Sequence, residues 1–251
     1  MSRKRAHSLL EAVVVLALGS FVTLVTALAL NNALKIFNNT SGRDTALRDL
    51  SKARRALEMD LNQASADLAI MQSPASLGGG ADGDALNYLS AVNVTDGSIA
   101  TLADGSGNPY FFQNIFYYIT VPTDHNALFN LNCVGGNEGG YDYNCPHKML
   151  IRGVEDQNPI YDPADTGSVD SLLTPLAPFL VRPTGFPNTP TRDTIAINLL
   201  TFQVVQVGRE LRVDLRAVSI PDARRKVAIG STSFRESGYT LVYRFSVFPR
   251  N

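Results

Sequence analysis

The feature that most constrains this chain is an uncharged apolar run of 19 residues, residues 12–30 (AVVVLALGSFVTLVTALAL). As a helix rising about 1.5 Å per residue, the run is ~28 Å long, close to the ~30 Å hydrocarbon core of a bilayer. Arg3, Lys4 and Arg5 precede it. Because basic flanks stay in the cytoplasm, we expect a single-pass protein of the inner (cytoplasmic) membrane whose chain after Asn31 is extracytoplasmic.

Three membrane roles are open to such a run. A secretory signal peptide has a shorter apolar core, about 7–15 residues, followed by a small-x-small cleavage site. Here the run is longer and leads towards Lys35 and a helical pattern. A plain signal anchor fits the length but does not explain Glu11, one residue before the run, because an ionisable group at that depth is costly and needs a partner.

Residues 3–18 resemble the class III signal of type IV prepilins and type II secretion pseudopilins. That signal has a basic leader, a small residue before the cut, an aromatic or apolar residue, Thr or Ser, two aliphatic residues, Glu and an apolar helix. Residues 8–11 (SLLE) match in type and spacing. Ala6 stands where the family usually has Gly, and His7 where it usually has Phe or Met.

The resemblance implies that a prepilin peptidase cuts between Ala6 and His7 and that methylation of the new N-terminus follows. Glu11 would then be the fifth residue of the mature chain. Its carboxylate could pair with the α-amine of a neighbouring subunit, so that two costly charges neutralise each other inside a helix bundle. The alternative is that Glu11 is only a polar flank at the membrane interface.

An apolar stripe at helical spacing continues beyond the membrane run, between residues 43 and 72, and predicts an amphipathic helix. Its members are Leu47, Leu50, Leu57, Leu61, Ala64, Leu68 and Met71. Residues 38–42 (NNTSG) are poor helix formers, so a kink or loosening is expected there. Pro74 is expected to end the helix.

The remainder of the chain predicts strands, because its segments are rich in β-branched and aromatic residues. The expected strands are residues 115–121, 149–154, 179–182, 195–207, 210–215 and 239–248. Gly208 and Arg209 separate two of them, and a Gly at the first central position suits a type II′ hairpin turn.

Helices first and strands afterwards indicate an α+β fold with a mainly antiparallel sheet. We expect a cytoplasmic leader (1–6), a transmembrane or filament-core helix (7–36), an amphipathic continuation of that helix (37–73) and an extracytoplasmic β-rich globular domain (74–251). This order resembles the pilin plan, in which one long helix packs on a sheet, and loosely that of PilW-type minor pilins and of pseudopilin J.

Cys133 and Cys145 enclose a loop rich in glycine. If this loop is extracytoplasmic, it lies in an oxidising compartment, where two thiols that flank a flexible segment favour a disulfide. The alternative is a pair of reduced, buried cysteines.

No catalytic or ligand-binding pattern stands out. The chain has neither a Gly-x-Ser-x-Gly nor a His-Glu-x-x-His motif, and three histidines with two cysteines do not fit a zinc cluster of the usual spacing. Its formal net charge of −1 disfavours nucleic-acid binding. We therefore expect that the protein is not an enzyme and that it binds neither a metal nor a cofactor.

The expected function is that of a minor pilin or pseudopilin subunit, which initiates or caps a type IV pilus or a type II secretion pseudopilus. Its partners would be other such subunits, the membrane and the processing peptidase. The rival from a different class is a membrane-anchored extracytoplasmic binding domain whose leader is never cut. A third possibility, an anchored hydrolase, lacks a recognisable set of catalytic residues.

Overall fold

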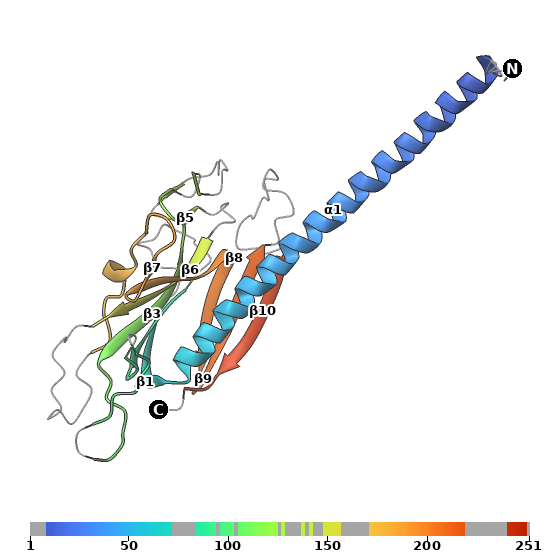
Figure 1. The fold of residues 1–251 in the computed structure, drawn as a ribbon. Coiled ribbons are helices and arrows are strands. Elements are labelled where there is room, and N and C mark those ends of the chain that lie inside the picture. The colour runs from blue at the N-terminus through green and yellow to red at the C-terminus, as the bar shows by residue number, and fades with distance from the viewer. Residues whose placement is uncertain are drawn as a thin grey trace.

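The computed structural model describes residues 9–71, 84–93, 96–102, 105–124, 127–128, 137–138, 141–142, 148–156, 171–218 and 240–249. One long helix, α1 (Leu9–Leu61), leans on a curled antiparallel sheet (Figure 1). The N-terminal half of the helix projects away from the sheet, and its C-terminal half crosses β8 (Arg192–Val207), β9 (Glu210–Val218) and β10 (Thr240–Val247). The architecture is therefore α+β, as the sequence predicts.

Helix α1 is held by a narrow apolar stripe near its C-terminal end. The buried residues are Ala46, Leu50, Ala53, Leu57 and Leu61, at steps of four, three, four and four, which place them on one face of a helix. The helix is continuous through residues 38–42, so the loosening expected there is absent. It ends at Leu61, twelve residues before the predicted end at 73.

Within the described residues, eight strands form one antiparallel sheet, and β4 (Asn137–Glu138) pairs separately with β5 (Tyr141–Asp142). The sheet runs in the order β1, β2, β3, β6, β8, β9, β10, and β7 (Asn188–Thr189) pairs with β8. The first four strands of this order are β1 (Ala64–Met71), β2 (Ala85–Ser90), β3 (Gln113–Thr120) and β6 (Lys148–Glu155).

Five of the six predicted strands are confirmed, as β3, β6, β8, β9 and β10. The prediction for 179–182 is wrong: a 3-10 helix (Ala177–Phe179) covers the start of that segment, and the chain then runs without regular structure. Pro178 and Pro183 on either side remove backbone donors that a strand would need. The hairpin between β8 and β9 is confirmed, because Val207 pairs with Glu210 and Gly208 has a φ of 62°.

The two halves of the sheet differ in how they are covered. In β2 and β3 every residue is buried, because a segment that includes Leu173, Leu176 and Leu180 packs against the sheet. Asn114 holds this segment: its Nδ2 donates to the Ser171 carbonyl at 3.0 Å, and its Oδ1 accepts from the Leu173 amide at 3.2 Å. In β9, by contrast, alternate residues are buried, so one face of that strand is open to solvent.

Gly153 of β6 lies directly against a buried aromatic ring in the covered half. It is paired with Phe116 of β3, and a Cβ built on Gly153 would meet three atoms of the Phe116 ring, the farthest of them at 2.9 Å. Only glycine leaves room for this ring.

Candidate functional site

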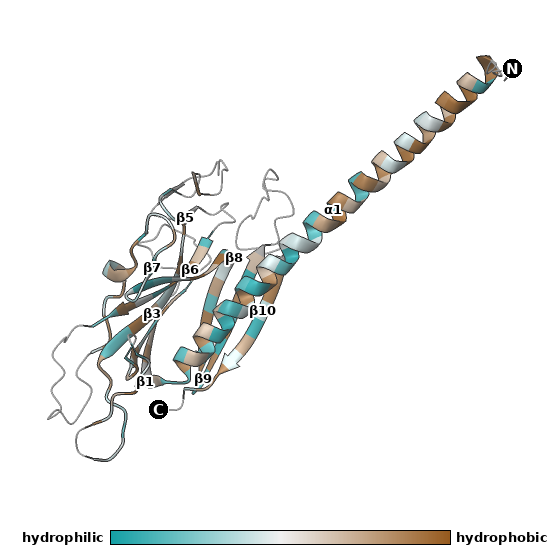
Figure 2. Ribbon diagram, viewed as in Figure 1, coloured by the Kyte–Doolittle hydropathy of each residue, from teal (hydrophilic) through white to brown (hydrophobic). Residues whose placement is uncertain are grey.

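The N-terminal part of α1 is an exposed apolar rod. Every residue from 9 to 41 is exposed, and the first buried residue of the helix is Ala46. Hydrophobic residues predominate along this part, whereas polar and apolar residues alternate nearer the sheet (Figure 2). Helix α1 is long and apolar enough to cross a membrane, by length and composition, and it is the one such helix in the described part of the chain.

The three polar side chains of the apolar run, residues 12–30, are satisfied within the helix. The hydroxyls of Ser20, Thr23 and Thr26 each donate to the carbonyl four residues earlier, at 2.8 Å. A hydroxyl bonded in this way carries little penalty in an apolar environment. The run is therefore suited to burial in lipid or among other apolar helices.

Glu11 lies in the first turn of α1 and is exposed. A carboxylate there interacts favourably with the positive end of the helix dipole. The predicted cleavage site, Ala6 and His7, lies outside the described residues, as do Cys133 and Cys145. The structure thus gives the place of the predicted assembly residue, but it does not bear on the leader or on the disulfide.

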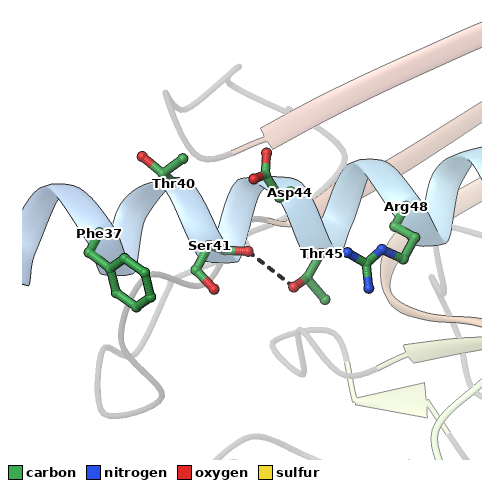
Figure 3. A pocket seen from close by; sticks show the side chains of 6 residues that line it. All are labelled: Phe37, Thr40, Ser41, Asp44, Thr45 and Arg48. Carbon is green, nitrogen blue, oxygen red and sulfur yellow. Dashed lines mark hydrogen bonds between the residues drawn. The ribbon is translucent and has the colours of Figure 1, made fainter.

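Between the apolar run and the first buried residue lies a stretch that we call the neck, residues 31–45. A groove of about 240 Å³ runs along its C-terminal part (Figure 3). It is lined by Phe37, Thr40, Ser41, Asp44, Thr45 and Arg48. The Thr45 hydroxyl donates to the Ser41 carbonyl at 3.0 Å, so it too is bonded within the helix. The groove is therefore lined by an aromatic ring, three hydroxyl side chains and one charge of each sign.

A polar cluster, which we call the Asp60 cluster, fixes the other end of α1 to the sheet. One oxygen of Asp60, Oδ2, accepts a hydrogen bond from Arg152 Nε of β6 at 2.5 Å and another from the Tyr117 hydroxyl of β3 at 2.7 Å. The Asp60 and Arg152 side chains are only 21% and 18% exposed. A shielded ion pair of this kind is costly to break, because either partner alone would be left uncompensated.

Burial and charge shift the pKa values of this cluster. Burial raises the pKa of the Tyr117 and Tyr88 hydroxyls well above the usual value, and the nearby Asp60 carboxylate raises both further. Burial lowers the pKa of Arg152, but the Asp60 carboxylate and the Tyr117 and Tyr88 hydroxyls together outweigh it, so the net change is upward. Both tyrosines are consequently neutral, and Arg152 is charged, at physiological pH.

A second contact joins α1 to the edge of the sheet. The Arg54 guanidinium lies over the Tyr243 and Phe245 rings of β10, 5.2 and 5.9 Å from their centroids. It also donates to the Tyr243 hydroxyl and pairs with Glu58 one helical turn away. Cation–π contacts at partly exposed sites contribute about 0.5–1 kcal/mol each.

The open face of β8, β9 and β10 carries charges that compensate one another. A groove of about 430 Å³ there includes Val205, Asp214 and Arg244 among its lining residues. Asp214 pairs with Arg216 at 3.1 Å and with Arg244, its partner across the strands, at 2.9 Å. This face therefore presents no concentrated charge of one sign.

The sequence did not single out the Asp60 cluster, because 57 positions separate Asp60 from Tyr117 and 92 separate it from Arg152. One signal was present: Arg152 interrupts the apolar segment 149–154 (MLIRGV), and a charge in a buried strand needs a partner. Among the residues that the structure describes, no three His, Cys, Asp or Glu side chains are grouped so that they could hold a metal ion.

Comparisons with protein-family models, with curated proteins and with solved structures found no match to this chain. The functional assignment therefore depends on the apolar rod, the neck and the base of α1.

Proposed function

We propose that the chain is a minor pilin or pseudopilin-like structural subunit, which initiates or caps a type IV pilus or a type II secretion pseudopilus. The globular domain would be extracytoplasmic, and the partners would be other subunits, the membrane and a prepilin peptidase. Its role is assembly rather than catalysis, and it involves no cofactor. The observation that carries the proposal is the bare length of α1.

That length exceeds what a membrane anchor needs. The 37 residues from Leu9 to Thr45 extend ~56 Å, whereas the hydrocarbon core of a bilayer covers ~30 Å. If the apolar run spans the bilayer, the neck stands outside it. Leu34, Ile36 and Phe37 of the neck are each at least half exposed.

The composition of the neck also favours lateral partners. Asn, Thr, Ser and Gly cost roughly 0.5–1 kcal/mol each relative to Ala in a helix interior. The neck residues of these types are Asn31, Asn32, Asn38, Asn39, Thr40, Ser41, Gly42 and Thr45. A helix of this composition in water gains little from its own side chains. Packing against neighbouring helices in a filament would cover the apolar residues and support the helix.

The decisive test is the substitution Glu11→Leu, with Glu11→Asp as the control that keeps the charge. If Glu11 pairs with a neighbour's α-amine, Glu11→Leu leaves that ammonium uncompensated, and breaking such a pair costs about 3–5 kcal/mol. The variant should reach the membrane in normal amount but co-purify poorly with partner subunits and give fewer filaments, while Glu11→Asp should retain most of both. Normal partner recovery and filament counts for Glu11→Leu would refute the pairing.

Processing distinguishes the subunit from the anchored rival. N-terminal sequencing and intact mass of the membrane-extracted protein should give a mature chain that begins at His7. A chain that begins at Met1 or Ser2, in cells that possess the peptidase, would decide for the anchored binding domain.

A further inference from the structure

Strand β1 has a sequence better suited to a helix than to a strand. Its eight residues (ASADLAIM) include three Ala, a Leu and a Met, all strong helix formers, and a single β-branched residue, Ile70. The apolar stripe of α1 also continues into it, because Ala64 and Leu68 follow Leu61 at steps of three and four. Local sequence and observed structure therefore disagree in this segment.

The place of β1 in the sheet adds to that conflict. Among the described residues it is an edge strand that pairs with β2 alone, and its register shifts between Ala64 and Leu68. An edge strand loses one ladder on release, whereas a central strand loses two. The β1 segment is therefore the least firmly paired long strand at this end of the sheet.

The sequence at the end of α1 contains only a weak stop signal, Asn62 directly after Leu61. Residues 58–64 contain neither Gly nor Pro, and the last turn has no basic residue. It carries Glu58 and Asp60 instead, and negative charges at a helix C-terminus are unfavourable. Two turn hydrogen bonds close the helix, from the Asn62 amide to the Glu58 carbonyl and from the Gln63 amide to the Asp60 carbonyl, each at 3.1 Å.

Tertiary contacts supply what the sequence lacks. Arg152 compensates the Asp60 charge at the helix end, and Tyr117 holds the same carboxylate oxygen. The last turn of α1 is thereby tied to β3 and β6, and the chain must leave it alongside β2. In this position the next residues can pair as a strand.

We propose that residues 62–71 form a convertible segment, which is the edge strand β1 while the Asp60 cluster is closed and becomes a continuation of α1 when the cluster opens. The conversion adds ten residues to the helix and lengthens it by ~15 Å. It also frees the edge of β2 for pairing with another strand. The inference does not depend on the proposed function, since it concerns the base of the helix in either an anchor or a subunit.

The chain length permits the conversion. When the helix is extended, Met71 lies ~15 Å beyond Leu61. In the observed structure the eight residues of β1 instead form a strand that covers ~26 Å. Asp84 then lies roughly 41 Å from the new position of Met71 when the added helix and the former strand point in opposite directions. The thirteen steps of chain between Met71 and Asp84 span up to ~45 Å when extended.

The test is solution NMR of the full chain in detergent micelles with ¹³C-labelled alanine, because the Cα shift of alanine distinguishes helix from strand. The reporters are Ala64 and Ala69, each assigned by its own Ala→Ser substitution. The test variant is Asp60→Leu/Arg152→Met. It removes both charges of the ion pair, so that no single buried charge is left without its partner. The matched control is Glu210→Leu/Arg212→Met, which removes an ion pair of 2.9 Å on β9.

In the unsubstituted chain and the control, both alanines should give strand shifts. In the Asp60→Leu/Arg152→Met chain they should move to helix shifts while amides of β8 and β9 keep their protection from hydrogen exchange. Strand shifts in a folded test variant would overturn the proposal. If that variant unfolds, the deciding variant is Tyr117→Phe, which removes one hydrogen-bond donor only. Partial movement of the alanine shifts towards helix values supports the proposal. Unchanged shifts overturn it, and so does global unfolding, because the cluster would then hold the whole sheet and not β1 alone.

Discussion

Replacing Gly153 by alanine tests how tightly the covered half of the sheet is packed. The added methyl group would overlap the ring of Phe116, and that ring has little freedom to move. The Arg192 guanidinium lies 5.6 Å from its centroid, and the Tyr118 and Phe179 rings lie 6.0 and 6.4 Å away. Phe116 itself is completely buried.

The expected loss follows from this confinement. Inserting a methyl group into a packed core typically costs about 1–3 kcal/mol, and the upper end applies because ring, guanidinium and backbone must shift together. For a chain of this size, about 1 kcal/mol lowers Tm by about 2–4 °C. Gly153→Ala should therefore lower Tm by about 6–12 °C.

The assay is thermal unfolding of the full chain in micelles, followed by near-ultraviolet circular dichroism of the tyrosines. Gly19→Ala is the matched control, since nothing lies within 4 Å of a Cβ at that position. Combining Gly153→Ala with Phe116→Leu should cost less than the two changes added together, by about 0.5–3 kcal/mol. The overlap between the added methyl group and the Phe116 ring would be refuted by an unchanged Tm for Gly153→Ala. Strictly additive effects in the double variant would refute it as well.

Three further outcomes are expected. Cys133 and Cys145 should be bridged, so that denatured but unreduced protein takes up no alkylating agent; two reactive thiols would contradict this. The free energy of unfolding should fall as the pH rises through about 10, because tyrosine in the unfolded chain releases a proton that Tyr117, with its raised pKa, retains in the folded chain. Urea titrations at several pH values should show a shallower decline for Tyr117→Phe than for the unsubstituted chain. Parallel curves for the two chains would contradict this prediction. Arg54→Ala should lower the urea midpoint through loss of its ring contacts, whereas Arg55→Ala on the exposed side of α1 should leave that midpoint almost unchanged.

Strands β9 and β10 could be predicted from their alternation, because only one face of each packs on the core. In β10, Thr240 to Val247 alternate in type, and β9 does the same, so the pattern and the packing agree. Strand β2 (ALNYLS) shows no such alternation, because both of its faces are covered and a buried Asn is bonded to the Leu173 carbonyl. Strand β3 (QNIFYYIT) is also buried along its whole length, but its β-branched and aromatic residues made it predictable, and β2 has only one residue of these types, Tyr88.

The end of α1 was mispredicted for a different reason. Propensity and periodicity both favour helix through Met71, and pairing with β2 overrides them. The position of Glu11 on the helix could be predicted, because it depends on a local pattern. The Asp60 cluster could not, because it joins three elements that only the folded chain brings together.

The bare rod and the held part of α1 together form a lever. The free arm from Leu9 to Thr45 is ~56 Å long, and the held arm from Ala46 to Leu61 is ~24 Å. A sideways force on the tip is therefore multiplied about twofold at the far end of the held arm, by the ratio of the two lengths. Asp60 is hydrogen-bonded to Arg152 and Tyr117 at that end. A force that bends the tip therefore loads these two hydrogen bonds.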